Sequence, residues 1–171
     1  MKKFFICLVI SLTSSLTSQA VETGYRGFFE YGYLIGVDDQ HRSSMNEIIT
    51  VHGWQMTPRI FLGAGVNLNL YKFKFYDDKI HYNLPLFADI RYDFLDSSIS
   101  PFLDFKMGYS VAGVFHGPYY NPSIGCRLAL GDSCGLNFGI GYTYFHTRYK
   151  FIVDGSDFNI TGVNLRVGVD F

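Results

Sequence analysis

Apolar and polar residues alternate along most of the chain with a period of two, which is typical of half-buried β-strands. In Ile160–Phe171, every second residue back from the end is apolar, and glycine, asparagine or a charged residue lies between. Eight segments show the alternation: Tyr25–Gly36, Asn46–Met56, Arg59–Phe73, Tyr82–Phe94, Pro101–Val111, Asn121–Leu130, Gly135–Phe145 and Ile160–Phe171. In Asn46–Met56 both faces carry apolar residues, so the pattern does not show which face points outward. The pattern predicts an all-β protein with eight antiparallel strands.

The connections between these strands alternate in length. Tight turns are predicted at Thr57–Pro58, Asp96–Ser98 and Gly131–Ser133. Longer polar loops are predicted at Val37–Met45, Tyr76–Ile80, Ala112–Pro118 and Val153–Asp157. Short turns at one end and long loops at the other are typical of an up-and-down barrel in an outer membrane. An even number of strands places both ends of the barrel on the short-turn side.

The composition of the two strand faces distinguishes a membrane barrel from a soluble one. A lipocalin-type barrel also has eight strands, but its interior is apolar and its exterior polar. Here one face is apolar and aromatic over about nine to eleven residues per strand, the length of a tilted membrane-crossing strand. Glycine, asparagine, serine and paired charges on the other face suit the narrow lumen of an eight-stranded barrel. We therefore expect a transmembrane β-barrel in which the last strand pairs with the first, leaving no open edge.

The first twenty residues have the pattern of a secretory signal peptide. A basic start, Met1–Lys3, precedes the apolar Phe4–Leu12, and Ser18–Ala20 places small residues at a cleavage site. The apolar run is too short for a membrane-spanning helix. An N-terminal helix retained as an anchor is the alternative. We expect residues 1–20 to be a cleaved signal peptide and residues 21–171 to form the barrel of an integral outer-membrane protein.

Composition and special residues refine this picture. The 13 Tyr, 17 Phe and 18 Gly suit strands, and a formal net charge of −1 gives no basic excess for binding nucleic acid.

A hairpin at Gly131–Ser133 would place Cys126 opposite Asn137 or Phe138. Cys134 would then lie roughly 13 Å from Cys126, beyond the reach of a disulfide, so two free thiols are expected. Pro85 and Pro122 predict bulges or positions near the rim, because proline cannot donate to a ladder.

Charged residues on the lumen face are the first candidate site. They are Glu30, Asp89, Arg91, Asp104, Lys106, Arg127, Arg166 and Asp170. They could form a conduction path or a catalytic cluster, but buried charges must be paired and the barrel is too small for an open pore. We therefore predict an ion-pair network that fills the lumen, with Arg166 or Lys106 paired to Glu30 or a neighbouring aspartate.

The five histidines offer little catalytic chemistry. The combination His41, Arg42 and Ser43 resembles the histidine and serine of lipid-modifying barrel enzymes, but it lies in a predicted loop. A nucleophile needs a base and an orienting group held in fixed geometry. His146 lies at the end of a strand and is expected to meet lipid headgroups. The sequence predicts no catalytic residues, no cofactor and no metal site.

Aromatic residues near strand ends form the second candidate set. They are Tyr31, Tyr33, Tyr92, Phe94, Tyr142 and Tyr144. Such residues are typical of the girdles that flank the apolar band of a membrane barrel. We expect them to contact outer-membrane lipids and lipopolysaccharide.

The strand segments resemble those of a known family. The resemblance is carried by "YRGFFEYGY", "PRIFLGAGV", "PLFADIRYDF", "SPFLDFKMGYS", "NPSIGCRLAL", "GLNFGIGYTY" and the terminal "VGVDF". These are similar to the small eight-stranded outer-membrane β-barrel proteins, the OmpX-like and OmpA-barrel-like group, especially its Bacteroidetes type. The resemblance implies that Val167, Val169 and Phe171 form a signal read by the barrel-assembly machinery. We also expect the barrel to be a monomer.

Three functions remain open from the sequence. The first is a non-enzymatic barrel that stabilises the envelope or presents its loops to partners, with its lumen plugged by charged side chains. The second is a lipid A- or phospholipid-modifying enzyme. The third is a narrow, porin-like channel.

Overall fold

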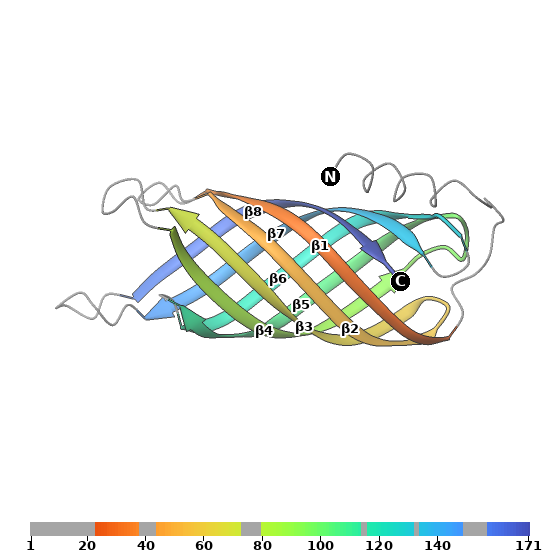
Figure 1. Cartoon of the computed structure of the whole chain (residues 1–171), viewed down its shortest axis with the longest axis horizontal. Helices are drawn as coiled ribbons and strands as arrows, with labels where there is room; N and C mark the ends of the chain where they lie inside the picture. The colour runs from red at the N-terminus through yellow and green to blue at the C-terminus, as the bar shows by residue number, and fades with distance from the viewer. Residues whose placement is uncertain (1–22, 38–43, 73–79, 114–115, 132–133, 149–156) are drawn as a thin grey trace, which may run out of the picture.

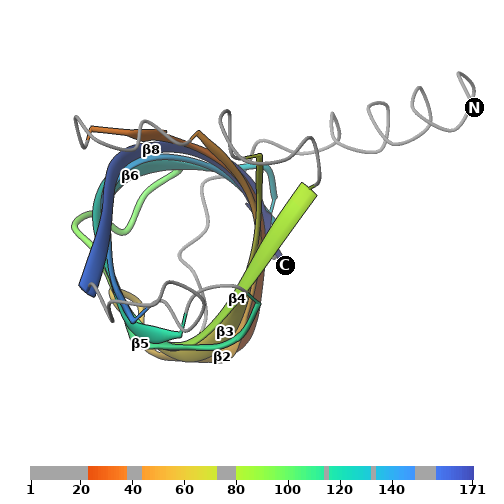
Figure 2. The same cartoon turned by 90° about the vertical axis from the view of Figure 1, so that its left-hand side faces the viewer.

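The computed structural model of the protein describes residues 23–37, 44–72, 80–113, 116–131, 134–148 and 157–171. Eight strands follow one another: β1 (Gly24–Gly36), β2 (Met45–Thr57), β3 (Ile60–Lys72), β4 (Ile80–Asp93), β5 (Ile99–Gly113), β6 (Gly117–Ala129), β7 (Gly135–Arg148) and β8 (Asp157–Asp170). Each strand pairs antiparallel with its neighbour in sequence, and together they form a closed barrel (Figures 1 and 2). The predicted fold class is therefore confirmed. The described ranges contain no helix that is long and apolar enough to cross a membrane.

The barrel closes where β8 pairs with β1, as the sequence predicted. The ladder runs from Phe28 opposite Asp170 to Gly36 opposite Gly162. Gly27 and Phe171 extend it with two backbone hydrogen bonds of 2.8 and 3.0 Å. Both ends of the described chain therefore lie at the same end of the barrel as the short turns (Figure 1).

The short turns of the structure lie where the sequence placed them. Thr57 stabilises the β2–β3 turn, because its hydroxyl accepts hydrogen bonds from the backbone N–H groups of Arg59 and Ile60 at 3.3 and 3.0 Å. The β6–β7 turn is closed by a bond of 2.9 Å from Leu130 N–H to the Cys134 carbonyl.

One of the predicted long loops is wrong. The segment Ala112–Pro118 was expected to be a loop, but β5 continues to Gly113 and β6 begins at Gly117. Tyr109 and Ser110 pair directly with Pro118 and Gly117. Gly113, the last residue of β5, has a φ of +102°, which an L side chain rarely adopts and which glycine tolerates. Gly113 is thus the last residue of β5 and Gly117 the first residue of β6, instead of both lying in a long loop.

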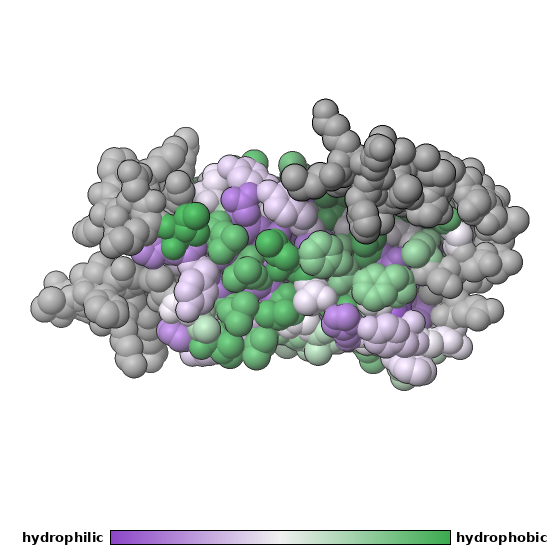
Figure 3. All heavy atoms as spheres, in the orientation of Figure 1, coloured by the Kyte–Doolittle hydropathy of each residue, from purple (hydrophilic) through white to green (hydrophobic). Residues whose placement is uncertain are grey.

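The outward face of the barrel is apolar and aromatic on every strand. Its large exposed residues include Phe29, Ile35, Leu62, Leu86, Ile90, Leu103, Met107, Ile124, Ile140, Leu165 and Val169. Figure 3 shows apolar residues over much of the visible face between the two ends of the barrel. The structure also settles the ambiguous β2, where Ile48, Thr50 and Trp54 point outward while Ile49 and Val51 are buried in the lumen.

The two prolines behave differently. Pro85 lies at a register shift between β4 and β5, so the predicted bulge is confirmed. Pro122 lies at neither a bulge nor a rim, which corrects the prediction. It pairs with Phe105 of β5, and the β6–β7 ladder skips Asn121 and Pro122 without changing register. A single missing N–H is therefore tolerated inside the closed sheet.

The predicted register of the β6–β7 hairpin is confirmed. Cys126 lies opposite Phe138. Cys126 and Cys134 are both free thiols in the structure.

Candidate functional site

All eight charged residues predicted for the lumen face inward and are no more than 6% exposed. They lie in two groups at different heights in the barrel. Three further buried charges join them, Arg26, Glu47 and Asp93. The lumen is therefore a densely charged interior, and the groups differ in how completely their charges are paired.

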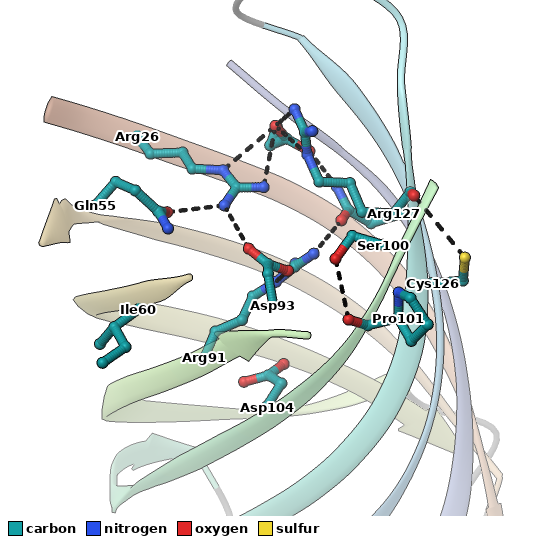
Figure 4. Close-up of polar contacts among 12 residues, drawn as sticks. Arg26, Gln55, Ile60, Arg91, Asp93, Ser100, Pro101, Asp104, Cys126 and Arg127 are labelled. Carbon is teal, nitrogen blue, oxygen red and sulfur yellow. Dashed lines mark hydrogen bonds and ion pairs between the residues drawn. The ribbon is translucent and has the colours of Figure 1, made fainter. Parts of the chain in front are cut away.

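The arginine cluster, near the short-turn end, consists of Arg26, Arg91, Asp93, Arg127 and Asp170. Figure 4 labels its three arginines and Asp93. Arg26 bridges both carboxylates, with Nη1 3.1 Å from Asp93 Oδ2 and Nη2 3.3 Å from Asp170 Oδ2. Arg91 Nε lies 3.1 Å from Asp93 Oδ1, and Arg127 Nη2 lies 2.8 Å from Asp170 Oδ2. Each aspartate is thus held between two arginines from different strands.

Amides and aromatic rings complete the arginine cluster. Asn137 accepts a hydrogen bond of 2.7 Å from Arg91 and donates one of 2.6 Å to Asp170. The Arg91 guanidinium lies 3.6 Å from the ring centre of Phe102 and 4.9 Å from that of Phe28. Stacking of this kind stabilises a cation that has been removed from water.

The middle cluster consists of Glu30, Asp89, Asp104, Lys106 and Arg166. Lys106 Nζ lies 3.7 Å from Glu30 Oε2 and 3.5 Å from Asp89 Oδ2, and it also donates to Asp104. Arg166 lies 3.2 Å from both Glu30 and Asp104. In this part of the lumen, two cations therefore form ion pairs with three carboxylates.

The loop-side half of the lumen is rich in amides. Its buried side chains include Glu47, Asn67, Asn69, Asn83, Ser110, Asn121, Thr143 and Asn164. Asn121 donates a hydrogen bond of 2.7 Å to Thr143, and Ser110 donates to Asn83. Glu47 forms no ion pair with any described residue, in contrast to the other lumen carboxylates.

Bulky apolar side chains also fill the lumen, which corrects the expectation of glycine, small polar residues and charges alone. The apolar cluster comprises Phe28, Leu34, Met45, Ile49, Val51, Phe61, Tyr71, Phe87, Tyr119, Phe145 and Ile160. Glycines on neighbouring strands make the room for these rings. A Cβ added at Gly65 would lie 2.7 Å from the Phe87 ring, and one at Gly125 would lie 2.3 Å from Phe102.

The second candidate set, the aromatic residues, lies on the outward face. Tyr31, Tyr33, Tyr92, Phe94 and Tyr142 are between 37% and 49% exposed, and Tyr144 is partly exposed. Tyr31 donates a hydrogen bond of 2.6 Å to Asn46. Val167, Val169 and Phe171 also point outward. These positions agree with the outward orientation that the alternation predicts for them.

The histidines show no catalytic arrangement among the described residues. His52 lies on the outward face, with Nδ1 2.6 Å from the Tyr25 hydroxyl and Nε2 3.0 Å from Thr50 Oγ1. His146 Nδ1 lies 2.7 Å from Asn159 Oδ1. His41, Arg42 and Ser43 lie outside the described residues, as does the predicted signal peptide. Within the described ranges, no cluster of three or more His, Cys, Asp or Glu residues is arranged to hold a metal.

Three charged residues of the lumen were absent from the predicted set. Arg26 lies an even number of residues from Glu30, and Asp93 an even number from Asp89, so each points to the same face as the residue already predicted for the lumen. The alternation could therefore have identified both as lumen residues. Glu47 lies on β2, where apolar residues on both faces concealed the parity. Its signal was weaker, because a charge within an otherwise apolar segment does not by itself show which way it points.

Comparison with solved structures identifies the fold. Neisserial surface protein A (NspA) matches 90% of this chain over 97% of its own length, with 13% identity and a TM-score of 0.62. The outer membrane protein OprG from Pseudomonas aeruginosa matches 89% of this chain over 97% of its own, with 8% identity and a TM-score of 0.59. No family model and no curated protein matches the sequence. The chain therefore has the fold of small outer-membrane β-barrels.

Proposed function

We propose that this protein is a non-enzymatic, integral outer-membrane β-barrel with a plugged lumen, which stabilises the envelope or presents its long loops to partners. It would reach that membrane through a cleaved signal peptide and lie there as a monomer among lipids and lipopolysaccharide. The fold supports the location, because the described strands bury polar groups and expose apolar ones. This is the arrangement that a bilayer requires.

The main support for a plugged lumen is that side chains from strands that do not pair contact one another inside the barrel. Arg26 of β1 contacts Asp93 of β4. Arg91 of β4 contacts Asn137 of β7. Arg166 of β8 contacts Asp104 of β5. Because two strands separate each of these pairs around the wall, the contacts cross the lumen and occupy the space that an aqueous path would need.

Conductance in planar bilayers tests the plug. We expect the wild-type barrel to show no stable openings, whereas the double variant Arg91→Ala/Arg166→Ala should conduct, because it loses two of the contacts that cross the lumen. A matched control is Ile90→Ala/Leu165→Ala, which changes outward-facing residues of the same two strands and should stay closed. A folding check is a mobility difference between unboiled and boiled samples on SDS-PAGE. Steady openings of the wild type would contradict the proposal.

The absence of enzyme activity needs a separate readout. We expect the mass spectrum of lipid A and the phospholipid profile to be the same with and without the gene. A change in acyl or headgroup composition that depends on the gene would favour a lipid-modifying enzyme instead. Tyr25, His52 and Thr50 on the outward face would then be the first described residues to substitute, because Tyr25 and Thr50 each share a hydrogen bond with the His52 ring.

Phe171 supports the proposed role of Val167, Val169 and Phe171 in assembly. Its backbone extends the β1–β8 seam, and a Cβ added at Gly27 would lie 2.6 Å from the Phe171 ring. Deleting Phe171 should lower the amount of assembled protein in the outer membrane while export across the inner membrane continues. The control is Ile99→Ala, which shortens another outward residue near the short turns. Unchanged membrane levels after the deletion would exclude this role.

A further inference from the structure

Glu47 of β2 is a fully buried carboxylate with no cationic partner among the described residues. Its two oxygens accept hydrogen bonds from neutral amides only, from Asn67 Nδ2 at 3.4 Å and from Asn164 Nδ2 at 2.8 Å. Arg166 passes beside it, since a Cβ added at Gly32 would lie 2.7 Å from Glu47 Oε2 and 3.1 Å from Arg166 Cγ. The guanidinium itself is bound to Glu30 and Asp104. Glu47 therefore has no ion pair of its own among the described residues, and Arg166 attracts it only from a longer distance.

The amides around Glu47 leave several oxygens without a donor. Asn69 lies directly opposite Glu47 in the β2–β3 ladder, on the same face, so the two Cβ atoms are about 5 Å apart. Asn69 is fully buried, and neither atom of its amide forms a hydrogen bond with any described residue. The Oδ1 atoms of Asn67 and Asn164 also lack a partner. The unpaired amide atoms of these three asparagines are therefore three oxygens and one nitrogen, Asn69 Nδ2.

A buried carboxylate without a counter-charge and a buried amide without a partner both raise the free energy of the folded state. Carboxylate and amide oxygens are the ligands that hard cations such as Ca²⁺ prefer. We propose that Glu47, with the side-chain oxygens of Asn67, Asn69 and Asn164, binds one small hard cation in the loop-side half of the lumen. We call this set of four residues the Glu47 site.

A cation accounts for the arrangement better than a proton does. A proton on Glu47 would supply one donor, whereas a cation can satisfy the carboxylate and several amide oxygens at once. A half-turn of the amide of Asn67 or Asn164 places Oδ1 where Nδ2 now faces Glu47. The charge balance also favours a cation. With every group ionised, the described lumen contains six buried carboxylates and five buried cations, so one negative charge is unmatched and a cation would compensate it.

The Glu47 site is closed off from the long-loop end. Leu34, Met45, Phe145 and Ile160 lie at that end of their strands and are at most 4% exposed. Leu34 pairs directly with Met45, and Phe145 pairs with Ile160. A cation in the site would exchange slowly with solvent, so it must be offered while the barrel folds.

The test is refolding of the full mature barrel in a non-ionic detergent. The buffer contains EGTA, CaCl₂, NaCl or choline chloride at matched ionic strength, and the urea midpoint is then measured. We expect the wild-type midpoint to rise with Ca²⁺ or Na⁺ relative to choline, in proportion to the logarithm of ion concentration above Kd. Radioactive ⁴⁵Ca²⁺ should be retained at about one ion per barrel after gel filtration if Ca²⁺ is the preferred ion.

Two variants locate the effect. Glu47→Gln and Asn69→Leu should both lose the ion-dependent rise of the midpoint. The control, Glu30→Gln, removes a carboxylate that is already paired with Lys106 and Arg166, so it should keep the rise. If the wild-type midpoint is the same in all four solutions, Glu47 is a neutral acid or is only hydrated, and the proposal is overturned. A rise that persists in both Glu47→Gln and Asn69→Leu places the ion elsewhere and overturns it equally.

Discussion

The two halves of the lumen contain equally buried polar side chains but pair them in opposite ways. In the arginine cluster, Asp93 and Asp170 are each bound by two arginines. In the Glu47 site, a carboxylate that is just as buried is bound only by neutral amides, and Asn69 has no hydrogen bond. Burial alone therefore does not show what a lumen residue contributes. A lumen residue stabilises the barrel when neighbouring charges or hydrogen-bonding groups would be left unpaired without it.

The comparison predicts that equivalent substitutions in the two halves will differ in effect. Removing one member of a buried, paired group leaves the others uncompensated and strongly destabilises the protein. Removing a group that has no partner relieves a penalty instead. Stability measured in EGTA with choline chloride as the added salt, so that neither Ca²⁺ nor Na⁺ is offered to the Glu47 site, separates the two cases.

Asp170→Asn should have the largest effect. It leaves Arg26 and Arg127 without their shared carboxylate, so Asp93 is the one carboxylate that remains in the arginine cluster, where it contacts Arg26 and Arg91. We expect a loss of about 3–5 kcal/mol in the free energy of unfolding, measured by urea titration of the barrel in detergent. The control is Asp96→Asn in the exposed β4–β5 turn, which should change stability by less than about 0.5 kcal/mol. A loss for Asp170→Asn as small as the control's would show that the arginine cluster does not stabilise the barrel.

A pair of asparagines on the lumen face gives the sharpest comparison. Asn137→Leu should cost about 2–3 kcal/mol, because Asn137 bonds both Arg91 and Asp170. In EGTA, Asn69→Leu should be neutral or stabilising by about 1 kcal/mol, because the leucine replaces an amide that lacks partners. Urea titration of both variants in the same detergent measures the difference. Equal losses would mean that burial, not pairing, decides the contribution of a lumen amide.

A pair of glycines tests packing in the arginine half and should give the smallest effect. Gly125 and Gly139 lie directly opposite each other on β6 and β7. A Cβ at Gly125 would lie 2.2 Å from the Phe138 carbonyl oxygen, whereas one at Gly139 would find its nearest atom at 3.6 Å. Gly125→Ala should therefore cost about 1–2 kcal/mol and shift Phe102 away from Arg91.

Gly139→Ala is the control for Gly125→Ala. It should be neutral or stabilising by about 0.5 kcal/mol, because alanine restricts the unfolded chain. The two free energies of unfolding, from the same urea titration, give the comparison. If both substitutions destabilise the barrel equally, the loss reflects the strand backbone and not the packing of Phe102 against Gly125.

Much of the fold could be read from local periodicity. Alternation of apolar and polar residues placed the strands and the short turns, and it oriented seven of the eight strands, because strand side chains must point to opposite faces in turn. The same rule put the eight predicted charges in the lumen. It failed at Asn46–Met56, where Ile48 and Ile49 are equally apolar and only the packing of Ile49 and Val51 against other lumen residues decided the face. It also failed at Ala112–Pro118, where pairing with β5 overrode glycine and proline signals.

The sequence by itself thus determined which residues face inward, and the tertiary structure decided which of them meet. Arg26 and Asp93 are 67 residues apart and lie on strands that do not pair. Their contact depends on the stagger of all the strands between them, because the tilt that closes a barrel sets the height of every side chain in the lumen. For the same reason no local pattern marked Glu47 as the unpaired carboxylate. It lacks a counter-charge because the closed sheet places Lys106 and Arg166 within reach of Glu30 and Asp104 instead.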